Sequence, residues 1–259
     1  MTAESNRGYV CIGREKVSEG KTKEEVARDR AGGGEDLKES FEIGREGQEG
    51  YPNRWPDGFD EEGADFRSTM QTFFESCKEV HALLMRGIAM GLGYSTDFFE
   101  DYVKTGDNTL RLLHYPPVLP GGFEGGKRIR AGAHTDYGDI TLLFQDSRGG
   151  LQVEKPGGGG WLDVQPREGT MIVNAGDLLA RWSNDLIRST KHRVVQPPFK
   201  GKEKEEGHPA RYSVAYFCNP DFDKWIEALP GTWEGEKGGK KYDGVNSGDY
   251  LVQRLTATY

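Results

Sequence analysis

The sequence GAHTDYGDITLLFQD, residues 132–146, decides the fold because it joins two strand-like runs through a short polar turn. The first run, IRAGAHTD, ends in His134 and Asp136, and the second run, DITLLFQD, follows at once. Residues i and i+2 of a strand project to the same side, so both side chains can face one ion. A rigid strand end with an imidazole and a carboxylate therefore predicts a metal site, and the alternative is a surface histidine beside a turn aspartate.

A third candidate ligand, His192, lies in SNDLIRSTKHRVVQPP, residues 183–198. Two imidazoles and one carboxylate on one face of an ion leave three coordination positions open, which is the ligand set of non-haem Fe(II) oxygenases. These donors do not prefer iron over zinc or copper by affinity, so the identity of the metal also depends on availability. We predict that His134, Asp136 and His192 hold Fe(II) and form the catalytic centre.

The run RYSVAYF, residues 211–217, supplies a candidate site for a small organic acid. Arg211 and Ser213 project to the same side of a strand, and a guanidinium fork with a hydroxyl suits a carboxylate. Tyr115, in the run RLLHYPP, offers another hydroxyl donor, and its alternative interpretation is a core aromatic residue. An arginine inside a strand supports the acid site, because an unpaired buried charge is costly.

The same alternation predicts a substrate pocket. Arg111 shares one strand face with Tyr115, Phe217 shares one with Arg211, and Tyr137 directly follows Asp136. Two aromatic rings and an arginine can hold a flat, carbonyl-bearing heterocycle by stacking and hydrogen bonding. The alternative for the two aromatic residues is ordinary packing inside a barrel.

Short strand-like runs separated by Gly, Pro and Asp dominate the chain from Thr109 onward. There are eight: TLRLLHY, RIRAGAH, ITLLFQ, LQVEK, WLDVQ, TMIVNA, STKHRVV and RYSVAYF. Their number and spacing predict a jelly-roll core in a mainly β fold with flanking helices. Apolar residues at helical spacing predict a long helix from Asp65 to Leu92, which would buttress the sheet.

These patterns divide the chain into four predicted regions. Residues 1–64 are polar and glycine-rich, and we expect an arm or elaborated loop that adds nothing to the core. The others are buttressing helices at 65–105, the β-barrel core at 106–221 and a C-terminal extension at 222–259.

Composition excludes several classes of protein. The net charge of −8 disfavours a nucleic-acid surface, and no apolar run approaches a membrane span. The N-terminus lacks a signal-peptide pattern, which predicts a cytoplasmic protein. Three distant cysteines predict packed thiols and argue against a disulfide framework. We expect a small-molecule substrate as the partner, and the sequence contains no indication of the oligomeric state.

From Arg7 to Tyr259 the chain resembles the isopenicillin-N-synthase-like Fe(II)/2-oxoglutarate-dependent dioxygenases, and within them the fungal thymine 7-hydroxylase branch. The runs that carry the resemblance include NRGYVCIGREK, DLKESFEIGREG, NRWPD, AHTDYGDITLLFQDSRGGLQV, VNAGDLLARWSND, RYSVAYFCNP and YLVQRLTATY. The resemblance implies a double-stranded β-helix, iron at the three ligands above, and 2-oxoglutarate anchored by Arg211, Ser213 and Tyr115. It also implies substrate contacts at Arg111, Tyr137 and Phe217.

Two departures from the family pattern accompany this resemblance. The strand-and-helix head that precedes NRGY in relatives is missing, so we expect a truncated head and an exposed sheet edge. Leu113 stands where plant members carry Asn two residues before the tyrosine, which agrees with a fungal-type protein.

We therefore expect an enzyme that uses O2 and 2-oxoglutarate to hydroxylate or oxidise a flat, thymine-like heterocycle, with release of succinate and CO2. Three alternatives remain open at this point. The first is an isopenicillin-synthase-like oxidase that does not use 2-oxoglutarate, and the second is an oxygenase of fungal secondary metabolism. The third is a non-catalytic metal-binding barrel, because of the missing head.

Overall fold

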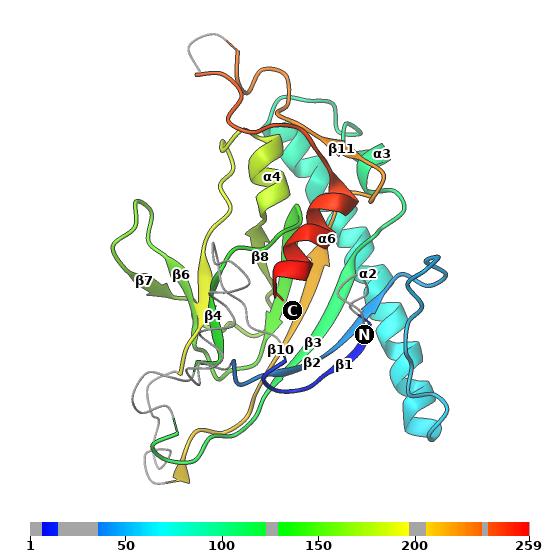
Figure 1. Ribbon diagram of the computed structural model, residues 1–259, viewed down its shortest axis with the longest axis vertical. Coiled ribbons are helices and arrows are strands. Elements are labelled where there is room, and N and C mark those ends of the chain that lie inside the picture. Colours follow the sequence, from blue (N-terminus) through cyan, green and yellow to red (C-terminus); the bar gives the residue numbers. More distant parts are fainter. Residues whose placement is uncertain (1–6, 15–35, 123–128, 197–205, 235–237, 259) are drawn as a thin grey trace.

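The computed structural model describes residues 7–14, 36–122, 129–196, 206–234 and 238–258 (Figure 1). A large antiparallel sheet forms the centre of this part of the chain. Its strands, in spatial order, are β1 (Gly8–Val10), β2 (Glu39–Gly44), β3 (Thr109–Tyr115), β10 (Arg211–Cys218), β5 (Ile140–Gln145) and β8 (Ile172–Ala175).

A smaller antiparallel sheet lies beside the large one. Its spatial order is β4 (Ala131–His134), β9 (His192–Val194), β6 (Leu151–Glu154) and β7 (Trp161–Asp163). Each of the eight runs predicted from the sequence contains one strand of β3 to β10, so this prediction is confirmed. A two-stranded ribbon of β11 (Trp225–Ile226) and β12 (Val245–Asn246) completes the β structure of the described residues.

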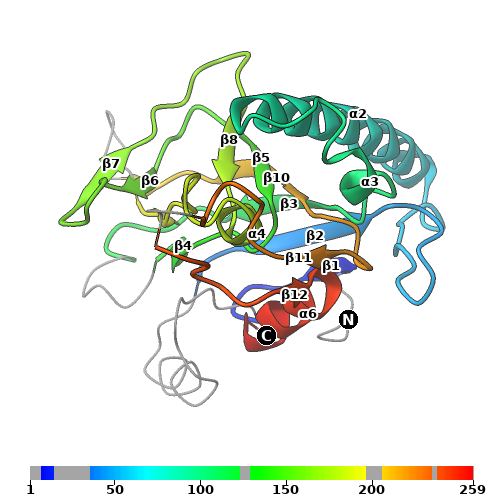
Figure 2. The ribbon, with the colours of Figure 1, turned by 90° about the horizontal axis from the view of Figure 1, so that it is seen from above.

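The long helix α2 (Glu61–Gly91) covers one face of the large sheet (Figure 2). It begins four residues earlier than predicted, because the Asp60 side chain accepts a hydrogen bond from the Gly63 amide and caps the first turn. Phe74 and Cys77 of α2 pack against Leu110 and Leu142 of the sheet in the main core cluster. This burial explains why a helix with an otherwise charged surface forms here.

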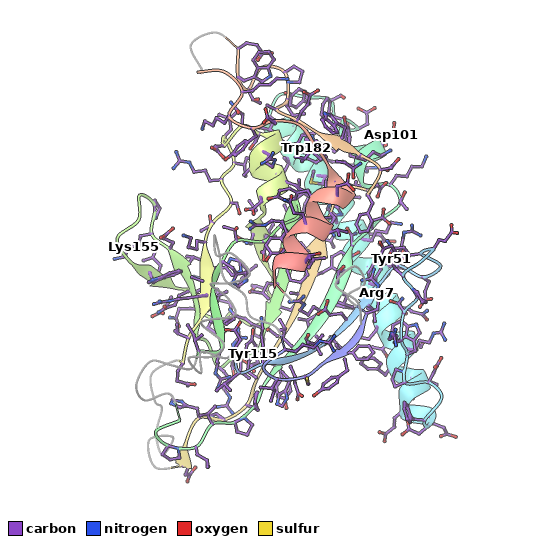
Figure 3. The ribbon with its side chains drawn as sticks, viewed as in Figure 1. Arg7, Tyr51, Asp101, Tyr115, Lys155 and Trp182 are labelled. Atoms are coloured by element: carbon purple, nitrogen blue, oxygen red, sulfur yellow. The ribbon has the colours of Figure 1, made fainter. Side chains whose placement is uncertain are left out.

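Three shorter helices also lie in the described part of the chain. They are α3 (Glu100–Val103), α4 (Asp177–Trp182) and α6 (Ser247–Thr258). Trp182 of α4 is buried against Phe99 and Tyr102, with ring centroids 4.9 and 5.0 Å away. Figure 3 shows Trp182 in the upper part of the molecule, at α4, and Tyr115 in its lower half.

The prediction that residues 1–64 add nothing to the core is wrong for the described part of that region. Strands β1 and β2 extend the large sheet beyond β3, and Val10 and Ile43 are buried. The strands were missed because both are short and lie in a polar, glycine-rich region: β1 has three residues, and polar and apolar residues alternate in β2 only over Ser40, Phe41, Glu42 and Ile43. Residues 1–6 and 15–35 lie outside the described part.

Two smaller predictions can also be compared with the structure. Cys77 and Cys218 are packed thiols as expected, whereas Cys11 is exposed. In the described ranges, none of the helices combines the length and the apolar character needed to span a membrane.

Candidate metal centre and pocket

The three predicted metal ligands come together in one pocket between the two sheets. His134 ends β4 and His192 begins β9, and the two residues are direct cross-strand partners. Their ring centroids are 4.3 Å apart, and Nε2 of His192 lies 3.6 Å from Oδ1 of Asp136. One donor atom from each residue lies within 4.8 Å of the others, which is close enough for a shared ion.

Backbone carbonyls fix the orientation of both imidazoles. Nδ1 of His134 lies 2.7 Å from the carbonyl oxygen of Gly132, and Nδ1 of His192 lies 3.2 Å from that of Thr190. A ring nitrogen that faces a carbonyl carries the proton, which leaves Nε2 as the unprotonated donor. Each histidine is therefore set to bind a metal through Nε2.

Asp136 lies two residues beyond the end of β4, so a turn and not strand alternation positions it. The Asn174 amide donates to Oδ2 of Asp136 over 2.6 Å, and the Asp136 carbonyl accepts from the Asp177 amide over 2.8 Å. The turn lies so close to β10 that a Cβ on Gly138 would be 2.2 Å from the Cys218 carbonyl oxygen. Glycine is required there because any side chain would displace the turn from β10.

The protonation states suit a cation. Burial, and then the neighbouring His192 imidazole, lower the pKa of His134 to about 3. Burial by itself would raise the pKa of Asp136, but the two imidazoles and the Asn174 amide bring it below its ordinary value. At neutral pH a neutral imidazole and a carboxylate are ready to coordinate, so the donor set fits Fe(II).

Arg211 lies in the same pocket with its guanidinium directed to neutral groups. Nε donates to the Gly149 carbonyl over 2.9 Å, Nη1 to the Ser213 hydroxyl over 3.2 Å and Nη2 to Oε1 of Gln145 over 3.1 Å. Its exposed fraction is 1%. A buried cation whose described partners are neutral favours an anionic ligand, because a paired charge costs less to bury.

Tyr115 lies beside this cation, and the ring faces two guanidinium groups. The Cζ atom of Arg211 is 4.9 Å from the ring centroid, and that of Arg130 is 5.8 Å away. Burial, and then the charge of Arg211, lower the pKa of Arg130 to about 10. No sequence pattern pointed to Arg130, because it precedes β4 and reaches Tyr115 only through the fold.

The predicted substrate residues line the other part of the pocket. Arg111 lies over the Phe217 ring, with its Cζ atom 5.2 Å from the ring centroid. Tyr137 lies next to the metal ligands, and its ring contacts Arg254 of α6, whose Cζ atom is 4.6 Å from the ring centroid. The strand alternation correctly predicted that Arg111 and Phe217 face the pocket. Tyr137 lines the pocket because it follows Asp136 directly. The roles of these three residues in binding a substrate stay predictions.

The structure adds pocket residues that sequence reasoning missed. Asn174 lines the pocket and holds Asp136. Lys38, Leu251 and Leu255 also line the pocket, from segments far from the metal ligands in sequence. The available signal in the sequence was the position of Asn174 in the run VNAGD, near the end of a predicted strand.

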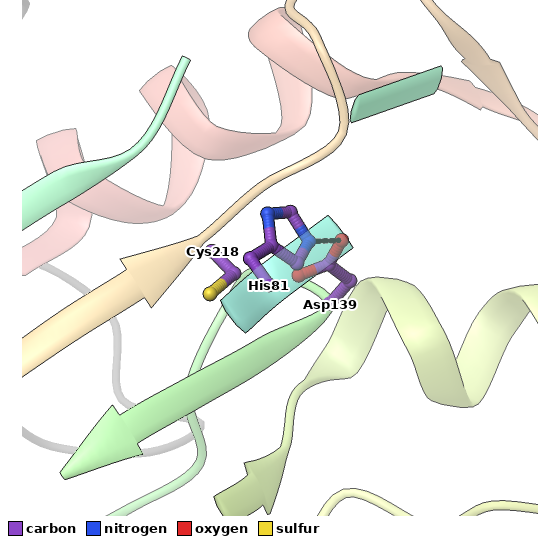
Figure 4. A group of neighbouring side chains, drawn as sticks. All are labelled: His81, Asp139 and Cys218. Carbon is purple, nitrogen blue, oxygen red and sulfur yellow. Dashed lines mark hydrogen bonds and ion pairs between the residues drawn. The ribbon is translucent and has the colours of Figure 1, made fainter. Parts of the chain in front are cut away.

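A second group of potential ligands lies just behind the first. His81 of α2, Asp139 and Cys218 lie within 4.8 Å of one another and are fully buried (Figure 4). Nε2 of His81 is hydrogen-bonded to Oδ2 of Asp139 at 3.0 Å. Burial raises the pKa of the Cys218 thiol well above its ordinary value, so the sulfur stays protonated and is a poor metal ligand. His81 is a fully buried core residue that holds the turn from Asp136 to Asp139 against α2.

Comparisons with known proteins agree with this geometry. The 2OG-Fe(II) oxygenase superfamily matches residues 106–220. The crystal structure of the full-length thymine 7-hydroxylase of Neurospora crassa, in complex with alpha-KG and thymine, superposes with a TM-score of 0.87 at 54% identity, over 100% of this chain and 76% of that chain.

Curated relatives support the same family. A 2-oxoglutarate-Fe(II) type oxidoreductase of Metarhizium rileyi is 41% identical over 99% of this chain and 71% of its own length. A proline hydroxylase of Petromyces alliaceus is 37% identical over 98% of this chain and 76% of its own length. Likeness of this degree over almost the whole chain confirms the resemblance seen in the sequence, so the protein belongs to the 2OG-Fe(II) oxygenase superfamily and is a dioxygenase that depends on Fe(II) and 2-oxoglutarate.

Proposed function

We propose that this protein hydroxylates a small, flat heterocycle, with thymine as the favoured substrate. In this proposal the core is a double-stranded β-helix, and His134, Asp136 and His192 hold Fe(II). The observation that carries it is that one pocket is lined by the three donors, by the buried cation Arg211 and by the aromatic pair Tyr137 and Phe217. Iron bound there would supply the oxidising chemistry by which 2-oxoglutarate, O2 and the substrate give succinate, CO2 and the hydroxylated product, with one oxygen atom of O2 in succinate and the other in the product.

Arg211, Ser213 and Tyr115 form the site for 2-oxoglutarate. The guanidinium and the hydroxyl are 3.2 Å apart, so both can donate to the two oxygens of one carboxylate. Leu113, Leu151 and similar apolar residues surround this end of the pocket, which keeps water away and strengthens the charge-assisted pair. The distal carboxylate of 2-oxoglutarate compensates the charge of Arg211.

Arg111, Tyr137 and Phe217 contact the substrate. The two rings offer faces for stacking, and the arginine offers N–H donors to ring carbonyl oxygens. Leu251 and Leu255 of α6 close this end with apolar side chains. The thymine in the crystal structure of the Neurospora crassa enzyme supports a pyrimidine as the substrate of this chain.

The test is a reaction of purified protein with Fe(II), 2-oxoglutarate and thymine, analysed by mass spectrometry for 5-hydroxymethyluracil and succinate. Both products are expected in equal amounts. Arg211→Gln is expected to raise the KM for 2-oxoglutarate more than about tenfold, since it removes a charge-assisted pair. A folded wild-type protein that converts no pyrimidine would overturn the substrate proposal.

A second candidate is an oxygenase of fungal secondary metabolism, favoured by the proline hydroxylase similarity at 37% identity. Its substrate would carry the carboxylate or peptide group of an amino acid. The same assay with L-proline and prolyl peptides separates the two candidates, because hydroxyproline is expected from the second and not from the first.

A further inference from the structure

Strand β2 places a buried carboxylate directly behind Arg111. Glu42 is opposite Arg111 in the register of β2 and β3, so both side chains project to the pocket side of the sheet. Oε1 of Glu42 lies 3.1 Å from Nε of Arg111 and also accepts from the Ser40 hydroxyl over 3.3 Å. Glu42 has no exposed surface, so this ion pair is not screened by solvent.

The partners of Arg111 differ from those of Arg211. Arg211 donates to a carbonyl, a hydroxyl and an amide oxygen, which leave its charge uncompensated. Arg111 contacts a carboxylate, so the pair offers N–H donors with little net charge. A negatively charged ligand is attracted by the uncompensated charge of Arg211. At Arg111 the same ligand would also be repelled by the carboxylate of Glu42.

The other cations near the substrate end are also close to carboxylates. Nζ of Lys38 lies 3.7 Å from Oδ2 of Asp36, and Nη2 of Arg254 lies 3.3 Å from Oδ2 of Asp177. Burial lowers the pKa of Arg7, while the charges of Glu42 and Asp107 oppose this shift. Asp107 is also paired with Arg45, whose side chain is partly exposed to water.

We propose that Glu42 is a specificity-determining residue: by compensating Arg111, it makes the substrate end select neutral, carbonyl-bearing rings and reject anions of the same shape. The inference rests on the proposed function in so far as it places the substrate against Arg111. It adds to that function a class of substrates, namely rings that are neutral at physiological pH. It also adds a residue, Glu42, that selects them from outside the metal and 2-oxoglutarate sites. The selection is a difference between two affinities, which one carboxylate can change.

The test compares Glu42→Gln with the wild type by anaerobic calorimetry, with Fe(II) and saturating 2-oxoglutarate so that the Arg211 end is filled. Two neutral and anionic pairs of flat ligands serve as probes, uracil with barbiturate and benzamide with benzoate. The wild type is expected to bind each neutral member more tightly. Glu42→Gln keeps the size of the side chain and is expected to shift both affinity ratios toward the anion by about tenfold, as for loss of one charge contact.

Two control variants separate charge from simple damage. Glu39→Gln changes a glutamate on the other face of β2, where it pairs with His114, and is expected to leave the ratios unchanged. Glu42→Gln combined with Arg111→Gln removes both charges and is expected to restore the preference for neutral ligands. A loss of packing alone would weaken both members of a pair equally and leave the ratio as it was.

The outcomes distinguish this inference from the proposed substrate. If benzamide binds better than benzoate but no pyrimidine binds, the pyrimidine proposal fails and the role of Glu42 stands. If the folded Glu42→Gln variant keeps the wild-type ratios, the inference is overturned. Should that variant not fold, a wild-type preference for barbiturate and benzoate would overturn it equally.

Discussion

Among the described residues, two clusters that each contain histidine and aspartate are made of similar donors but differ in what surrounds them. His134, Asp136 and His192 line an open pocket, whereas His81 of α2, Asp139 and Cys218 are fully buried in the core. Asp136 and Asp139 are three residues apart, and the turn between them directs one carboxylate to each side. In the first cluster Nε2 of each histidine is available, and in the second Nε2 of His81 is bonded to Asp139.

The difference shows that a set of ligand residues becomes a metal site only with free lone pairs and an approach for the ion. The pocket cluster has neutral imidazoles held by backbone carbonyls and a carboxylate held by Asn174. In the core cluster Nε2 of His81 and Oδ2 of Asp139 are bonded to each other, the Cys218 thiol stays protonated, and all three residues are fully buried. We conclude that the second cluster is a brace that holds the turn of the first in place.

The largest expected effect comes from removing a pocket ligand. His192→Ala is expected to weaken Fe(II) binding by more than about a hundredfold and to abolish turnover. This loss exceeds the one expected from removing a residue that only hydrogen-bonds to a metal ligand. Metal content after dialysis and succinate release measure both. His81→Ala serves as the control, and equal iron loss in the two variants would contradict the distinction between the clusters.

The brace should act on stability instead. His81→Ala leaves the buried Asp139 carboxylate without its imidazole partner and is expected to lower the free energy of unfolding by about 3 kcal/mol. Urea denaturation measures the change, with the iron content per folded protein expected to stay near that of the wild type. A variant with unchanged stability would show that the hydrogen bond is not a brace.

An intermediate effect is expected at the contact that orients Asp136. Asn174→Ala removes the amide that donates to Oδ2 over 2.6 Å and is expected to lower metal affinity by about tenfold to a hundredfold. Competition with a chelator measures this affinity. Asn219→Ala, another asparagine of the pocket, is the matched control, and an equal loss there would point to a general effect on the pocket.

The smallest effect concerns the thiols. Burial raises the pKa of Cys77 to about 11 and that of Cys218 well above its ordinary value, so both stay protonated at neutral pH, whereas Cys11 is exposed. Alkylation of the native protein with iodoacetamide is expected to label Cys11 alone, as read by peptide mass spectrometry. Rapid labelling of Cys218 would mean that the core cluster is open and would weaken the comparison.

Local patterns predicted the strands β3 to β10 and which of their residues face the pocket. Alternation along TLRLLHY and RYSVAYF places Arg111, Tyr115, Arg211 and Phe217 on the pocket face, because the side-chain period of a strand is fixed. The pairing of Asp136 with Asn174 was not predictable, since these residues are 38 positions apart and meet through sheet order. Strand β2 was missed because its polar residues Ser40 and Glu42 are buried beside β3 only in the folded chain, where Glu42 forms an ion pair with Arg111.

By itself, the sequence determined the eight strands β3 to β10, the long helix and the candidate residues for a metal and an organic acid, because these depend on short-range periodicity and side-chain chemistry. Only the tertiary structure decided that Glu42 compensates Arg111 while Arg211 keeps neutral partners, and that Asp136 faces the pocket while Asp139 faces the core. These choices depend on strand register and on burial, which bring distant charges together in a low dielectric.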